Sequence, residues 1–252
     1  MATSGTGKSS WRQDIRKSEY LTAAAKAAGL ALLAAYVFYD SPGAAVFMIP
    51  VGIFYLRDCI ADLAEKKERE FLGQFKDSIQ AVASGLKAGY SVENAIRGAG
   101  RDLEALYGPD RRIRREFRLM IRQLDMNMAA GPVLEAFAGR TGQEDVENFV
   151  NVFAAAKKSG GDSIAVIRNA VRLISDRIDT EKEIRTMIAS QKLEFDIMCV
   201  VPFVIILYMK ATFGEFLGAL YGNAAGASVM TVCLLLYMAA YRTGRKIVRI
   251  EV

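Results

Sequence analysis

The chain has 252 residues, of which 52% are hydrophobic and 24% are charged, and its formal net charge is +5. A chain that combines so much apolar and charged material must keep the two in separate blocks, which predicts membrane spans beside a soluble domain. It contains no histidine, which excludes histidine-based acid–base chemistry and histidine metal sites. The three cysteines lie far apart, so neither a CxxC metal site nor a disulfide framework is indicated. We expect no cofactor and no metal.

Residues 1–20 form a polar tail of mixed charge. The segment 2–9 within it fits the loose phosphate-loop pattern, with Ala2 in place of the first glycine. A phosphate loop works because a buried strand delivers it and a helix N-terminus receives the phosphates, and too few residues precede this segment to form a strand. We therefore interpret the match, including Lys8, as coincidence.

Two apolar runs follow, at residues 21–39 and 44–56, with a Pro-Gly turn between them. Each is close to the lower length limit for a membrane span, and together they predict a transmembrane hairpin over residues 21–57. A secretory signal peptide is the alternative. We disfavour it because the charged leader is long, Lys26 interrupts the apolar core and a second apolar run follows directly.

Residues 58–196 are rich in both charge signs and in helical periodicity, which predicts a cytoplasmic antiparallel helical bundle. The bundle is organised around the stretch 85–96, which has the pattern of a helix end, a tight turn and a new helix start. Gly89 can adopt the positive φ that stops a helix, and Ser91 can cap the next one. Apolar stripes at helical spacing lie on both sides of this turn: Phe71, Phe75, Ile79, Val82 and Leu86 before it, and Val92, Ala95, Ile96 and Ala99 after it.

Further helices are predicted along the bundle. One opens at Pro109 and Asp110, a short one covers residues 133–140 and is closed by Gly142, and one begins at Glu144. We interpret the paired acids Glu144 and Asp145 as solvated surface charges. The first of these helices has a stripe that should face the core: Ile113, Phe117, Met120, Leu124 and Met128.

A second glycine turn, at Gly160 and Gly161, precedes the last and longest helix of the bundle. This turn and its cap echo those at Gly89 and Ser91, which is either a weak internal repeat or a pattern that any helical bundle produces. The helix should be capped by Asp162 or Ser163. Its spacings of three and four indicate a seam like that of a coiled coil, formed by Ile164, Ile167, Val171, Ile174 and Ile178.

Arginines recur at spacings of four, three and four on the helix that opens at Pro109: Arg111, Arg115, Arg118 and Arg122. This spacing places them on one helix face, opposite the apolar stripe. Solvation is the ordinary fate of such a face, and anionic lipids are another. The row is nevertheless our best candidate for a partner-binding surface, because arginine forms bidentate pairs with carboxylates.

Two more apolar runs predict a second transmembrane hairpin over residues 197–241, followed by a basic tail at 242–252. Pro202 lies within the first of these runs and is interpreted as a kink without external significance. With four spans, both termini and the bundle lie on one side of the membrane. That side holds nearly all the basic residues, so it should be the cytoplasm. The predicted fold class is therefore all-α, an integral membrane protein with two transmembrane hairpins flanking a cytoplasmic bundle.

This layout, with the sequence LKAGYSVENAI at residues 86–96 and a second glycine turn at 159–161, resembles the type II secretion system F family. The presence of a single helical domain is similar to TadB and TadC of tight-adherence pili, rather than to the longer GspF or PilC type, which has two such domains. The resemblance covers about residues 20–250.

The resemblance implies a platform protein of the bacterial inner (plasma) membrane that engages a secretion ATPase and helps to move pilin subunits out of the membrane. The partners that it implies are the ATPase, prepilin or pilin subunits, the lipid bilayer, and a TadC-like paralogue or further copies of the chain, but no nucleic acid. The family offers no catalytic residues to transfer, and we interpret the chain as not being an enzyme.

Two other functions remain open. A transporter or channel would need ionisable or discontinuous elements deep within the spans, and the candidates, Lys26 and Lys210, lie near span ends. A membrane-anchored signalling module would also fit an all-α cytoplasmic domain. It would be distinguished by a histidine acceptor or a ligand pocket, and the chain has no histidine.

Overall fold

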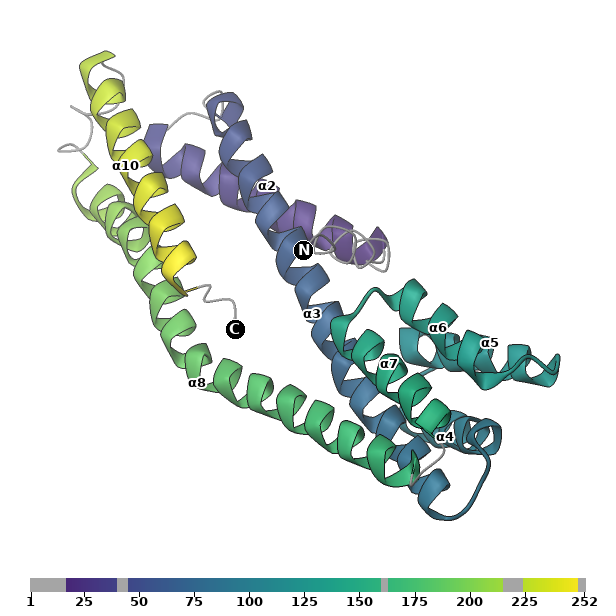
Figure 1. Cartoon of the computed structure of the whole chain (residues 1–252). Helices are drawn as coiled ribbons and strands as arrows, with labels where there is room; N and C mark the ends of the chain where they lie inside the picture. Colours follow the sequence, from purple (N-terminus) through teal and green to yellow (C-terminus); the bar gives the residue numbers. More distant parts are fainter. Residues whose placement is uncertain (1–16, 40–44, 160–162, 215–223, 249–252) are drawn as a thin grey trace. The chain divides into compact units, whose positions relative to one another are not determined.

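The computed structural model describes residues 17–39, 45–159, 163–214 and 224–248, and its regular elements there are all helices, as the sequence predicts (Figure 1). In chain order the helices are α2 (Lys17–Tyr39), α3 (Ala45–Lys87), α4 (Val92–Leu106), α5 (Arg112–Asp125), α6 (Ala130–Thr141), α7 (Glu144–Ser159), α8 (Ser163–Thr212) and α10 (Ala224–Val248).

The chain divides into two compact units. One, the bundle unit, includes Asp62–Thr180; the other, the span unit, joins Arg16–Ala61 with Glu181–Val252. The long helices α3 and α8 therefore each contribute to both units.

Aromatic side chains form the centre of the bundle unit. Phe75 of α3 lies 6.2 Å from Phe137 of α6 and 6.0 Å from Phe149 of α7, measured between ring centroids. The first four helices of the unit, α3 to α6, are joined to α7 and the first part of α8 by one continuous core. The predicted stripes supply much of it: Phe71, Phe75, Ile79, Val82, Leu86, Ala95, Ile96, Ala99, Ile113, Phe117, Met120, Leu124, Ile167, Val171, Ile174 and Ile178 are all buried.

The turn between α3 and α4 shows why glycine is needed there. Gly89 has φ +88°, a region that other residues rarely adopt, and the Tyr90 amide donates to the Gly85 carbonyl over 3.1 Å. Ser91 then starts α4, since its hydroxyl oxygen accepts a hydrogen bond of 3.3 Å from the Asn94 amide. A Cβ atom on Gly85 would lie 3.2 Å from the Ala95 backbone, so this hairpin is closely packed.

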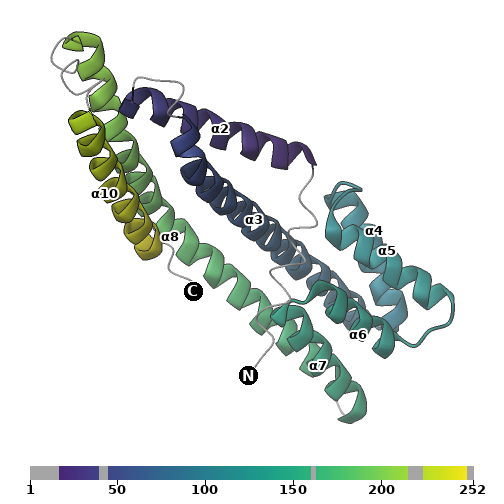
Figure 2. The same cartoon turned by 90° about the horizontal axis from the view of Figure 1, so that it is seen from above.

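Within the span unit, α10 lies beside the second half of α8 (Figure 2). The Tyr237 hydroxyl donates to the Cys199 carbonyl over 2.9 Å, and the Tyr237 ring meets Phe203 edge-on at 5.3 Å. Small residues of α2 pack against larger ones of α10 in a second, smaller apolar cluster: Ala34, Ala35, Val37, Met230 and Leu234. This packing joins the helices before and after the bundle.

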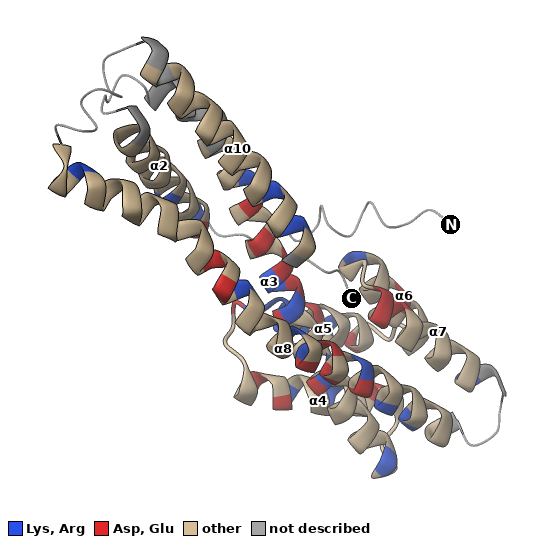
Figure 3. Cartoon of the chain, turned by 90° about the vertical axis from the view of Figure 1, so that its left-hand side faces the viewer, with Lys and Arg blue, Asp and Glu red and all other residues tan. Residues whose placement is uncertain are grey.

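By length and composition, two of the described helical segments can cross a membrane, Lys17–Val37 and Ile164–Thr212. Long parts of α2 and α10 carry no charge, whereas charged residues mark the helices of the bundle unit (Figure 3). In α8 the uncharged run between Asp196 and Lys210 is the apolar part.

The structure differs from the sequence prediction at several helix ends. No helix break lies near residues 57 or 196, where the predicted spans meet the predicted bundle, because nothing there stops a helix, and α8 also continues through Pro202. The last described helix, α10, also continues to Val248, past the predicted boundary at 241. The turn regions of both predicted hairpins and the apparent phosphate loop lie outside the described residues.

The helix expected to open at Pro109 begins at Arg112, because Arg111 is still extended with φ −70° and ψ 137°. That helix, α5, also ends at Asp125, so Met128 lies beyond it and is exposed instead of facing the core. The seam of α8 begins at Ile167 and not at Ile164, because Ile164 in the first turn of the helix is exposed.

Candidate functional site

The candidate site is the outward face of α5. The helix is held in place by the buried side chains of its inward face. Ile113, Phe117, Met120 and Leu124 are at most 5% exposed, and the Phe117 ring packs edge-on against Phe137 at 6.4 Å. Burial of these side chains contributes roughly 1.5–3 kcal/mol each. Because the apolar stripe is anchored in this way, the charged face of α5 has a fixed orientation on the bundle unit.

The loop that leads into α5 is fastened to α3 and α4. The Tyr107 hydroxyl donates to the Asp77 carboxylate, and Arg111 pairs with Glu70. Arg114 donates to the Tyr107 carbonyl over 2.9 Å and pairs with a glutamate of α4. Desolvation by burial, with the hydrogen bond to Asp77, raises the pKa of Tyr107 to about 12. These contacts fix the start of α5.

The arginines of this region divide into two groups. Arg111, Arg112 and Arg114 point to neighbouring elements of the bundle unit: Arg112, for example, donates to the Arg140 carbonyl over 2.8 Å. Arg118 and Arg122 are exposed, and neither forms an ion pair with any residue that the structure describes.

The predicted row is therefore only partly retained. Arg115, Arg118 and Arg122 lie on the helix and are all exposed. Arg111 lies at the N-cap of α5, where its pair with Glu70 ties it to α3. The outward face consequently begins at Arg115.

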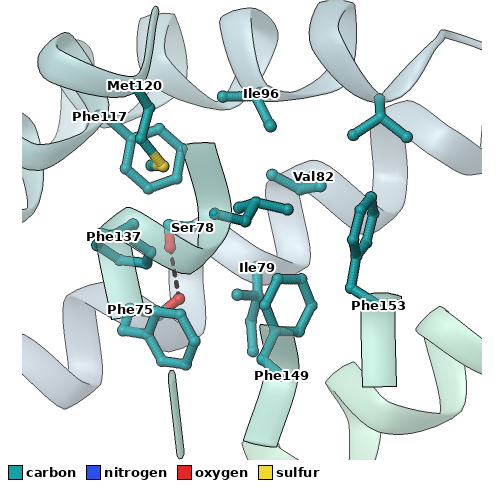
Figure 4. A pocket seen from close by; sticks show the side chains of 12 residues that line it. Phe75, Ser78, Ile79, Val82, Ile96, Phe117, Met120, Phe137, Phe149 and Phe153 are labelled. Carbon is teal, nitrogen blue, oxygen red and sulfur yellow. Dashed lines mark hydrogen bonds between the residues drawn. The ribbon is translucent and has the colours of Figure 1, made fainter. Parts of the chain in front are cut away.

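The cavity under this site is apolar (Figure 4). Its volume is about 20 Å³, and Phe75, Phe117 and Met120 are among the side chains that line it. Its polar member, Ser78, donates its hydroxyl to the carbonyl of Phe75 on its own helix over 2.7 Å. A space of this size, without an unused polar partner, suits neither a substrate nor a cofactor. It is a packing defect of the core, and the candidate site remains on the surface.

The predicted structural turns lie elsewhere. Gly89 and Ser91 form the tip between α3 and α4, where the Tyr90 side chain is exposed. Gly160 and Gly161 lie outside the described residues.

Sequence reasoning missed two buried carboxylates. Glu116, on the inner side of α5, receives a 2.8 Å hydrogen bond from Arg140 of α6. Its spacing of three from Ile113 and four from Met120 is a signal that could have placed it there. The interpretation of Asp145 as a solvated charge was wrong: its side chain is 9% exposed and pairs with Arg177 of α8 at 3.0 Å.

The comparisons with known proteins agree with the fold. The model of the family "Type II secretion system (T2SS), protein F" matches residues 78–210, which is more than half of the chain. The match runs from the end of α3 through α4 to α7 and into the apolar part of α8, and thus contains the whole of α5. No curated protein and no solved structure matches the chain. On the extent of the family match, the chain belongs to the type II secretion system protein F family.

Proposed function

We propose that the chain is the platform protein of a tight-adherence, type IV-like pilus machine, in which it couples a cytoplasmic secretion ATPase to pilin assembly. Proteins of the family are inner-membrane components of secretion or pilus machinery, and they work with an ATPase and with other platform proteins. The family consists of membrane platform proteins rather than known enzymes.

The observation that carries the proposal is the continuity of α3 and α8. The first runs without interruption from Ala45 to Lys87, and the second from Ser163 to Thr212. Each has apolar residues at one end and core residues of the bundle unit at the other. Each helix is one unbroken run of backbone hydrogen bonds from its apolar part to the core of the bundle unit, so we propose that it carries a displacement of the bundle toward the membrane. A platform that relays work from an ATPase requires such a connection.

The proposed layout has a cytoplasmic tail at 1–20, spans within 21–57, a cytoplasmic bundle at 58–196, further spans within 197–241 and a basic cytoplasmic tail at 242–252. The basic bias supports this orientation. We propose TadB- or TadC-like proteins as its counterparts because the chain has a single bundle. Its partners are then pilin subunits, the ATPase and a paralogue or second copy in the bilayer.

The ATPase docks, in this proposal, on the outward arginines of α5, Arg115, Arg118 and Arg122. Arginine is the residue best suited to bidentate pairing with carboxylates across an interface. The exposed, unpaired state of Arg118 and Arg122 among the described residues supports the assignment, because these charges are not used within the bundle unit.

Deletion of the gene tests the function. We expect surface pilin to disappear and pilin to accumulate in the inner membrane, with both restored by the wild-type chain. An affinity-tagged chain solubilised from complemented cells should also recover the secretion ATPase. Normal surface pilin in the deletion strain would contradict the proposal, and a selective loss of solute uptake would favour a transporter instead.

A further inference from the structure

The outward face of α5, together with its C-cap residue Met126, is not purely charged. Leu119 is 41% exposed and Met126 is 68% exposed, although both are large apolar side chains. At 3.6 residues per turn, the positions 115, 118, 119, 122 and 126 fall within an arc of about 100°. The two apolar residues therefore lie among Arg115, Arg118 and Arg122.

We propose that these residues form one docking patch, the α5 patch, in which Leu119 and Met126 are the apolar anchors and the arginines are the surrounding charges. Its occupant is a protein surface that offers an apolar groove bordered by carboxylates. This inference rests on the proposed function, and it identifies the part of the ATPase that meets the chain by its chemistry.

The positive charge of the α5 patch indicates that the partner surface carries carboxylates. On the inner side of the same helix, Arg114 has Glu104 at 3.2 Å, and at its start Arg111 has Glu70. Arg118 and Arg122 have no acidic partner among the described residues. The bundle unit thus pairs Arg111 and Arg114 internally, whereas Arg118 and Arg122 are available to an external acid.

The two exposed apolar residues, Leu119 and Met126, favour a protein partner over a lipid surface. A helix that lies on a membrane buries a broad apolar face, with aromatic and leucine side chains along its length. The broad apolar face of α5 is already buried in the core, through Ile113, Phe117 and Met120. The apolar surface that stays exposed, at Leu119 and Met126, is small and lies among arginines. Arginine and methionine are both enriched at protein interfaces, where a central anchor fills a pocket and charges lie around it.

The neighbouring acid does not neutralise the patch. Asp125 lies at the end of α5, but its carboxylate is held by Arg97 of α4 at 3.0 Å. The same guanidinium also donates a hydrogen bond to the side-chain oxygen of Asn94 on its own helix. An acidic partner would therefore meet arginine on the α5 patch without first displacing this pair.

The test measures binding of the purified secretion ATPase of the same machine to the full-length chain in nanodiscs of neutral lipid. One variant carries Arg118→Glu with Arg122→Glu, and a second carries Leu119→Ser with Met126→Ser. The matched control carries Arg172→Glu with Leu173→Ser on α8, where the two side chains are likewise exposed, with Leu173 at 70%. Circular dichroism and thermal unfolding confirm that each variant keeps the fold.

The charge variant should bind about tenfold or more weakly at an ionic strength of about 0.05 M, with a smaller loss at about 0.5 M, because salt screens exposed charges. The apolar variant should bind about tenfold or more weakly at both ionic strengths, because it truncates both anchors and apolar burial depends little on salt. The control should bind like the wild type.

Wild-type affinity in both patch variants, with the wild-type chain binding the ATPase, would overturn the α5 patch and leave the proposed function standing. A loss in the charge variant alone would overturn the anchoring role of Leu119 and Met126. If the variants bind the ATPase like the wild type but no longer bind vesicles that contain phosphatidylglycerol, the patch is a lipid site and the inference fails. Absence of any binding by the wild-type chain would overturn the proposed function together with the inference.

Discussion

Asp58 of α3 and Arg245 of α10 form an ion pair of 3.0 Å in the span unit, with side chains that are 20% and 21% exposed. The Arg245 guanidinium also donates to the Tyr241 hydroxyl over 2.8 Å, and the Tyr241 ring stacks on Phe195 of α8 at 5.9 Å. This cluster joins α10 to the two helices that continue into the bundle unit. In the proposed topology it lies at the cytoplasmic boundary of the membrane.

Removal of either charge should loosen this junction. We expect Asp58→Asn and Arg245→Gln each to lower the free energy of unfolding by about 1–3 kcal/mol, because a largely buried charged group loses its partner. Thermal unfolding in detergent measures the effect. The exchanged pair, Asp58→Arg with Arg245→Asp, should recover part of the lost stability. If the exchange lowers the free energy of unfolding by more than the two single changes together, the pairing is contradicted.

Gly244 allows α10 to approach α8 closely. A Cβ atom at this position would lie 2.3 Å from the Phe195 ring, so the ring would have to leave its stack on Tyr241. Gly244→Ala should therefore cost about 1–3 kcal/mol of stability. Gly139→Ala on α6 is the matched control, because nothing lies within 4 Å of its Cβ position. Equal melting temperatures for the two variants would show that the helices do not meet at Gly244.

The Tyr107 hydrogen bond gives stability a dependence on pH at the alkaline end. The pKa of Tyr107 is raised from its usual 10.0 to about 12, so the folded state holds the phenolic proton more tightly than the unfolded state. The stabilisation is complete below pH 10 and is lost as the pH rises toward 12. Tyr107→Phe should be less stable than the wild type at pH 9 by about 1 kcal/mol. This difference should shrink at pH 11, and a constant difference across this range would contradict the assignment.

Much of the bundle was predictable because its signals are local. Apolar stripes at helical spacing identified the buried faces of α3, α4 and α5, and Gly89 with Ser91 gave the turn between α3 and α4. Such features depend on residues a few positions apart, which a single sequence displays.

The features that the sequence did not show depend on distant residues or on missing stop signals. Asp145 is buried because Arg177, which lies 32 residues further along the chain, reaches it across α7 and α8. The ends of the predicted spans do not coincide with helix ends, since a change from apolar to charged residues alters the surroundings of a helix but not its backbone hydrogen bonds. On the candidate site, the spacing of the arginines placed them on one face. It could not tell that Arg111 precedes the helix and pairs with Glu70.

Substitutions of two glycines should act in opposite directions. Gly89→Ala places a side chain at φ +88° and should destabilise the chain by about 1–2 kcal/mol. Gly98→Ala, inside α4 and with nothing within 4 Å of the new Cβ atom, should stabilise it by about 0.5–1 kcal/mol. Chemical denaturation of both variants provides the comparison. A neutral effect at Gly89 would mean that the turn adopts another conformation.

The proposed function depends on the side of the membrane on which the bundle unit lies, because a cytoplasmic ATPase can reach it only from within the cell. Single cysteines at positions 43, 173 and 222 are introduced into a variant that lacks Cys59, Cys199 and Cys233, and intact spheroplasts are treated with an impermeant maleimide. The proposed topology predicts labelling at Gly43→Cys and Gly222→Cys, and labelling of the exposed Leu173→Cys only after lysis. Labelling of Leu173→Cys in intact spheroplasts would place the bundle on the outer side of the inner membrane and contradict the proposed topology and function.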